Sequence, residues 1–125
     1  MNKRVRSIAF GMTTLFGLAL VAPAAAQSDW TQYFDYQGIT FYYAPSTVTH
    51  NGGMTTAKWH DSNHPEIVFL VQIDCSARTI QSMSVDKYDP QSGAFLGSVD
   101  LTGQSAPEQI GADYTMAAHL AQVTC

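Results

Sequence analysis

A two-residue alternation, clearest toward the end of the segment between positions 66 and 75, constrains the fold of this chain more than any other feature of its sequence. Ile67, Ile73 and Cys75 lie in the apolar phase of that segment, and polar residues occupy the opposite phase toward its end. A period of two is typical of a β-strand with one buried face. The segment therefore predicts a strand that carries Cys75 on its core face.

Shorter segments with the same period predict the rest of an antiparallel sheet. The expected strands, about six in all, cover residues 39–43, 47–50, 55–60, 66–75, 78–88 and 95–101. Asn51-Gly52-Gly53 predicts a tight hairpin, because these residues tolerate positive φ, and residues 89–93 consist of turn formers. The apolar phase shifts between Ile80 and Met83, which predicts a β-bulge.

The last part of the chain predicts a single helix. Residues 112–123 are rich in Ala, Met and Leu, and Met116, Leu120 and Val123 recur at helical spacing. Asp113 is placed to cap this helix or to lie in its first turn. So short a helix is unstable alone in water and must dock on the sheet. The predicted fold class is α+β, an antiparallel β-sheet of about six strands with one C-terminal helix docked on it.

The first 26 residues have the features of a signal peptide. Three basic residues precede a mostly apolar core at residues 8–21, and Ala24 and Ala26 form the A-x-A pattern of a cleavage site before Gln27. The alternative is an uncleaved anchor, but the core of roughly 15 residues is shorter than the about 20 that span a bilayer. We expect a signal peptide at 1–26 and no membrane span after its removal.

Residues 27–125 form one expected domain outside the cytoplasm. No cysteine follows the cleavage site, so we expect a soluble product without a lipid anchor. Three of the six basic residues leave with the signal peptide and all ten acidic residues stay, which gives a net charge of −7 with neutral histidines. Phosphate backbones are bound by clustered Lys and Arg, so the composition argues against a nucleic-acid partner.

Cys75 and Cys125 are the two cysteines of the chain. In an exported protein they favour a disulfide, and a bridge between them would tether the helix to the sheet. It would close a loop of about 50 residues and contribute about 4 kcal/mol by the chain-entropy estimate. An intermolecular bridge through Cys125 and two free thiols are the alternatives.

The sequence contains no G-x-S-x-G, Gly-rich phosphate loop, H-E-x-x-H or C-x-x-C motif. We therefore expect neither an enzyme nor a cofactor. His60 and His64, with Asp61 and Glu66 beside them, are the one cluster of metal-ligand types. We expect no metal, because Asp-Ser-Asn and His-Pro are turn sequences, and we keep a site on His60 and His64 as the alternative.

Two further features bear on binding. Four aromatic residues close to the new N-terminus are expected to form an exposed apolar surface, for example a dimer contact: Trp30, Tyr33, Phe34 and Tyr36. Arg78 is one of the three basic residues of the mature chain. We expect it to pair with a carboxylate at the sheet edge, and contact with a ligand is the alternative.

Several segments together resemble a known family. They are Gly38-Ile39-Thr40-Phe41-Tyr42-Tyr43, Trp59, Gln72-Ile73-Asp74-Cys75-Ser76-Ala77-Arg78-Thr79-Ile80, Tyr88-Asp89 with Gly93, and Cys125. Across residues 27–125 the chain resembles the surface-adhesin protein E-like domain of Gram-negative bacteria. The resemblance implies an antiparallel sheet with a C-terminal helix tethered by Cys75–Cys125, and a role at the cell surface. The founding adhesin is a lipoprotein, and no ligand-binding residue of the family is carried over.

The expected function is that of a non-enzymatic binding or interaction protein of the bacterial envelope. It would act in the periplasm, or as a secreted or surface protein with an adhesin-like role. The expected partner is a protein, either a matrix protein or a second copy of the chain in a dimer. The alternatives are a small periplasmic metal-binding protein that uses His60 and His64, and a structural envelope protein.

Overall fold

The computed structural model describes residues 29–111 and 115–125, so the expected signal peptide and the Asp113 cap lie outside the described residues. Its elements in chain order are β1 (Thr31–Tyr36), β2 (Ile39–Tyr43), the 3-10 helix η4 (Pro45–Thr47), β3 (Thr49–Asn51), β4 (Met54–Asp61), β5 (Ile67–Asp74), β6 (Thr79–Tyr88), β7 (Phe95–Asp100), β8 (Glu108–Gln109) and α1 (Met116–Thr124). No helix among the described residues is long and apolar enough to cross a membrane.

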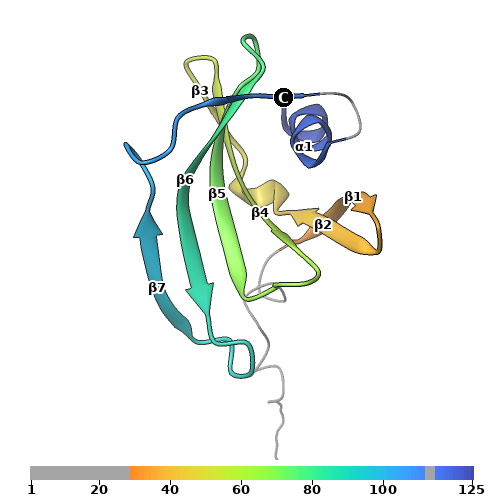
Figure 1. Ribbon diagram of the computed structural model, residues 1–125, viewed down its shortest axis with the longest axis vertical. Helices are drawn as coiled ribbons and strands as arrows, with labels where there is room; N and C mark the ends of the chain where they lie inside the picture. The colour runs from red at the N-terminus through yellow and green to blue at the C-terminus, as the bar shows by residue number, and fades with distance from the viewer. Residues whose placement is uncertain (1–28, 112–114) are drawn as a thin grey trace, which may run out of the picture.

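The strands form one antiparallel sheet. Its main path runs β1-β2-β4-β5-β6-β7, with β3 paired to β4 and β8 paired to β6. Figure 1 shows that the sheet curves strongly and that α1 lies on its concave side. The α+β prediction of a largely antiparallel sheet with one C-terminal helix is confirmed.

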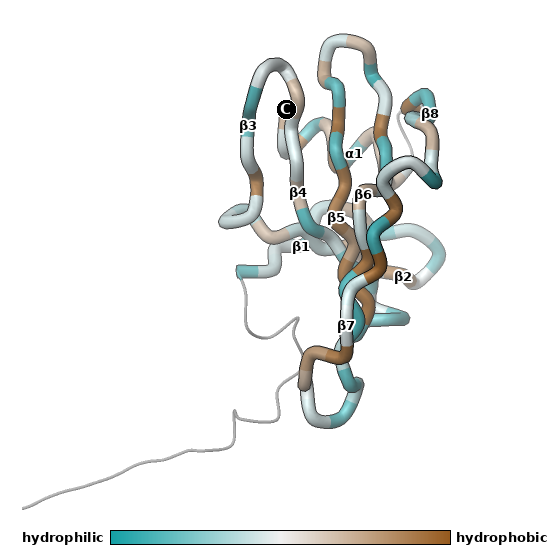
Figure 2. The backbone as a smooth tube through the Cα atoms, turned by 90° about the vertical axis from the view of Figure 1, so that its left-hand side faces the viewer, coloured by the Kyte–Doolittle hydropathy of each residue, from teal (hydrophilic) through white to brown (hydrophobic). Residues whose placement is uncertain are grey.

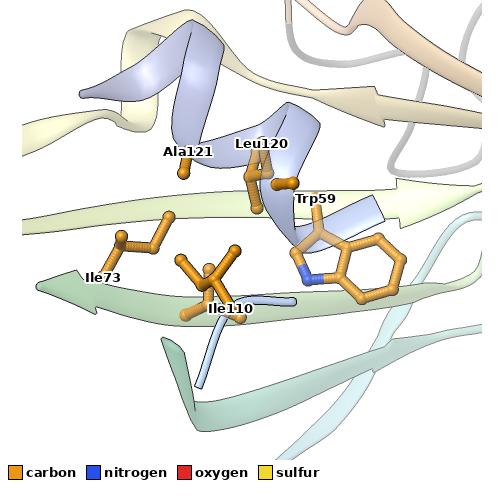
Figure 3. Close-up of a cluster of buried hydrophobic side chains, with 7 residues drawn as sticks. Trp59, Ile73, Ile110, Leu120 and Ala121 are labelled. Atoms are coloured by element: carbon orange, nitrogen blue, oxygen red, sulfur yellow. The ribbon is translucent and has the colours of Figure 1, made fainter. Parts of the chain in front are cut away.

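The core lies between the concave face of the sheet and α1. Val71 and Ile73 of β5 point into it. Ile73 is fully buried, and so is Leu120, which belongs to α1. Figure 3 shows Ile73, Leu120, Ile110 and Trp59 converging on the same space. The alternation that predicted β5 therefore identifies its core face correctly at Val71 and Ile73, whereas Val68, in the opposite phase, is buried as well.

The helix differs from its prediction in its N-cap and in one residue of its docking face. Thr115 caps it, because its Oγ1 accepts a hydrogen bond from the backbone N–H of Ala118 at 3.1 Å. Val123 was expected on the docking face, yet its side chain is exposed, and Thr124 is buried in its place. The small side chains of Ala118 and Ala121 turn the close-packed face of α1 away from Val123.

The disulfide joins Cys75 and Cys125 within one chain and links the end of β5 to the end of α1. No free cysteine remains among the described residues. The intramolecular prediction is confirmed, and the alternatives of an intermolecular bridge and of two free thiols are wrong.

The details of the sheet confirm some predictions and correct others. The expected bulge is present in β6, where Leu70 pairs with Ser84 and Val71 pairs with Ser82, so that Met83 has no partner on β5. The expected strand at 47–50 begins later, at Thr49, because η4 precedes it. The strands β1 and β8 were not predicted.

Candidate functional site

His60 is one of the two histidines of the alternative metal site. It lies in β4 and is buried, with only 3 % of its surface exposed. Its ring stacks on Tyr42 at 5.0 Å and meets the edge of Trp30 at 4.4 Å. Nδ1 donates a hydrogen bond to the carbonyl of Asp61 at 3.1 Å, whereas Nε2 is buried without a hydrogen bond. Burial lowers the pKa of His60, so the imidazole is neutral at pH 7.

His64 lies in the exposed β4–β5 loop. The Asp61 carboxylate organises that loop by accepting hydrogen bonds from the backbone N–H groups of Asn63 and His64 at 2.9 and 3.0 Å. The His64 imidazole lies 3.7 Å from the same carboxylate. The described part of the chain contains no group of three or more His, Cys, Asp or Glu side chains that could hold a metal ion.

The four N-terminal aromatic residues do not form the exposed surface that was expected of them. Phe34 stacks on His119 of α1 at 4.2 Å, Tyr33 packs against Tyr43 at 5.8 Å, and Trp30 covers His60. Burial, with a smaller contribution from the Asp61 charge, raises the pKa of Tyr33. Only Tyr36 of the four is among the exposed large hydrophobic residues. These side chains mainly fill the space between β1 and its neighbours.

Exposed apolar side chains gather instead on β7. Phe95, Leu96 and Val99 are 59, 64 and 46 % exposed. The strand β7 ends the main path of the sheet and pairs only with β6 among the described residues, so its outer edge carries no strand. We call this outer edge, with its three apolar side chains, the β7 edge; it forms one border of the sheet in Figure 1.

The backbone of the β7 edge can accept another strand. The N–H of Leu101 donates to the carbonyl of Met83 on β6 at 2.9 Å. Because amide directions alternate along a strand, the N–H of Val99 also points toward β6, and that of Ser98 points outward. The outward groups are the ones that an added strand would pair with.

Two carboxylates lie near the ends of β7, and Lys87 lies opposite Gly97 on the neighbouring strand β6. Hydrogen bonds from the backbone N–H groups of Ser92 and Gln91 hold the pKa of Asp89 below its usual value. Hydrogen bonds from Thr102 do the same for Asp100, the last residue of β7. Both carboxylates are therefore ionised at neutral pH, and they place negative charge near both ends of β7.

A cleft of about 580 Å³ lies beside α1, and we call it the α1 cleft. Its walls come from the β5–β6 turn, from the segment after β8, and from α1. The lining residues are Cys75, Arg78, Ile110, Ala118, His119, Ala121, Gln122 and Cys125. Arg78, His119 and Gln122 supply the polar side chains, and none of the eight residues is acidic.

The carboxylate partner expected for Arg78 is not found among the described residues. The guanidinium makes neither an ion pair nor a hydrogen bond with the residues that the structure describes. Asp74, the nearest acid in the sequence, instead accepts hydrogen bonds from the backbone N–H groups of Ser76 and Ala77 at 3.1 and 3.0 Å. The turn therefore uses the carboxylate and leaves the guanidinium beside the α1 cleft.

The residues of both surfaces were visible in the sequence, but their exposure was not. The strand alternation that predicts residues 95–101 does not tell which strand ends the sheet. For Arg78, the sequence did contain a signal that its expected partner is engaged elsewhere, since the nearest carboxylate lies four residues earlier and can cap the turn.

Comparisons with family models, curated proteins and solved structures find no match for this chain. Membership of the surface-adhesin protein E-like family therefore stays a prediction.

Proposed function

We propose that this chain is an exported, non-enzymatic binding protein of the bacterial envelope, and that it holds an extended segment of a partner protein along the β7 edge. The single observation that carries the proposal is the outer edge of β7, which pairs with no other strand in the described part of the chain and whose side chains Phe95, Leu96 and Val99 are well exposed.

Strand addition is the binding mode that suits such an edge. Main-chain hydrogen bonds to an added strand supply affinity, and contacts at alternate side chains supply specificity. Sheet edges that must avoid pairing usually carry Lys or Pro, or are covered by another element. From Phe95 to Asp100 the strand contains neither residue and a single charge, at its end. By contrast, the ring of Phe34 on β1, at the other border of the sheet, packs on α1.

The charge around the edge selects the partner. Asp89 and Asp100 bring negative charge close to β7, and the expected mature chain is strongly acidic. A segment that alternates apolar residues with Lys or Arg complements this surface, and a second acidic copy of the chain does not. We therefore favour a basic, extended segment of another protein over self-association. An adhesin role, in which the partner is a matrix protein, is one case of this binding.

The test uses the oxidised protein and a synthetic peptide that alternates Val and Lys over nine residues. The matched control peptide has the same side chains and N-methylated amides on one edge, which removes the hydrogen bonds of strand addition. We expect NMR shifts and slowed exchange of the Ser98 amide with the first peptide and none with the second. A Leu96→Ser, Val99→Ser variant should lose the binding, and Val123→Ser, an exposed apolar position on α1, should keep it.

Three results would contradict the proposal. The first is that both peptides bind equally well, and the second is that the double variant binds the peptide as well as the wild type does. The third is that the wild type sediments as a dimer and the double variant does not, which would assign the edge to a second copy of the chain.

Export is tested separately by the intact mass of the periplasmic product. The mass should correspond to a chain that begins at Gln27 and carries no acyl group, and recovery of the uncleaved chain would contradict the export prediction.

A further inference from the structure

We propose that the α1 cleft is a second binding site, which takes a carboxylate group carried on a short apolar stem. This site is independent of the β7 edge. The strand β7 begins, at Phe95, at the end of the molecule away from α1, as the two views in Figures 1 and 2 show.

The charge of the cleft is opposite to that of the chain as a whole. Residues 27–125 carry ten acidic and three basic residues. Of the three, Lys58 is paired with Asp86 at 3.6 Å and Lys87 lies on β6. Among the residues that the structure describes, Arg78 is the one basic side chain that lines the α1 cleft, and no Asp or Glu side chain lines it. In an acidic protein, this cleft is therefore a local site for an anion.

The backbone holds Arg78 in place at the cleft. Its carbonyl accepts hydrogen bonds from the backbone N–H of Ile110 at 2.8 Å and from Nε2 of Gln109 at 2.9 Å. Its φ of +55° lies in the left-handed region, where glycine is the favoured residue. An arginine at this position is unfavourable for the backbone compared with glycine.

The other lining groups define the shape and polarity of the ligand. His119 Nδ1 lies 3.0 Å from the carbonyl of Thr115, which can only accept, so Nδ1 carries a proton and donates it to that carbonyl. Gln122 is exposed, and its side chain offers amide donors in the lining of the same cleft. Ile110, Ala118 and the disulfide supply apolar contact surface for a short stem.

One guanidinium matches one carboxylate. Its two parallel N–H donors fit the two oxygens of a carboxylate, and the single charges balance. A phosphate carries more charge, and the cleft offers no second cation. The carboxylate can come from a small organic acid or from the C-terminal residue of a peptide, and both would present the same group to Arg78.

The experiment titrates the oxidised protein with three probes and follows backbone amides by NMR. The probes are 3-phenylpropionate, an acetylated Ala-Leu dipeptide with a free carboxylate, and the same dipeptide as its C-terminal amide. We expect both acids to shift the amides of Ala118, His119 and Gln122, and the amide probe to shift none. The tighter of the two acids identifies the source of the carboxylate.

The variants separate the proposed contact from general charge effects. Arg78→Gln should weaken acid binding about 10-fold or more, the loss expected for one charge-assisted bidentate contact. Lys87→Gln changes the net charge equally at a site about 30 Å away along β6, and it should leave binding unchanged. The proposal is overturned by equal losses in both variants, by equal binding of the amide probe, or by no saturable shift up to about 10 mM acid.

Discussion

Removing the disulfide should lower the stability of this domain by a large fraction of its total. The variant Cys75→Ala, Cys125→Ala removes the covalent link and leaves no thiol to form a new one. In the folded state α1 keeps its other contacts, since Leu120 is fully buried and Ala118 and Ala121 are nearly so. The main effect is therefore expected in the unfolded chain, which gains conformational freedom.

The sequence separation of the two cysteines sets the magnitude. They are 50 residues apart, and closing a loop of that length removes about 4 kcal/mol of unfolded-state entropy at 25 °C. A domain of this size has a total stability of about 5–15 kcal/mol. At about 4–8 °C per kcal/mol, the loss corresponds to a decrease in Tm of about 15–30 °C.

Urea unfolding followed by far-UV circular dichroism measures this loss directly. The double alanine variant should unfold at lower urea, and wild-type protein in reductant should unfold like the variant. The variant itself should not respond to reductant, which serves as the control. A variant within about 1 kcal/mol of the wild type would refute the loop-closure reasoning, because even a modest share of the entropic term exceeds that margin.

Three further predictions follow from single side chains. Leu120→Ala should cost about 2–5 kcal/mol in urea unfolding because it opens a cavity in the core, and Val123→Ala on the exposed side of α1 should cost less than about 0.5 kcal/mol. Arg78→Gly should raise the free energy of unfolding by about 0.5–1 kcal/mol. Glycine removes the backbone strain of the left-handed φ, and this gain exceeds the loss from a more flexible unfolded chain. A lower free energy of unfolding would contradict this prediction. Burial lowers the pKa of His60 in the folded state, so the unfolded chain binds a proton first as the pH falls below about 6.5. The Tm of the wild type should therefore decrease more between pH 7.5 and 5.5 than the Tm of His60→Gln, and equal decreases would contradict this prediction.

Local periodicity explains which parts of the fold could be predicted. The segment 66–75 and the helix have one buried face each, so their patterns contain the information that defines them. The strand β1 lacks such a pattern. A register shift between Gln32 and Phe34 against β2 leaves Tyr33 and Phe34, which are adjacent in sequence, both half-buried. A period of two cannot identify a strand with such an irregularity.

The candidate surfaces depend on contacts between distant segments, which is why the sequence did not reveal them. The apolar residues of β7 were predicted as a strand, but their exposure follows from the position of β7 at the end of the sheet path. The α1 cleft requires Arg78, Ile110 and Gln122, which are brought together by β8 and the disulfide-linked helix. The two-residue strand β8 is too short to show any period.

The disulfide connects stability with the proposed carboxylate site, because Cys75 and Cys125 are themselves lining residues of the α1 cleft. Breaking the bond removes part of the wall and loosens the helix that carries His119 and Gln122. The β7 edge rests on pairing with β6 and lies away from this region. Under conditions in which the double alanine variant stays folded, it should therefore lose acid binding and keep the binding of the Val-Lys peptide. If both activities are lost together, the two surfaces are not independent, and if both are kept, the bond contributes to stability and not to the cleft.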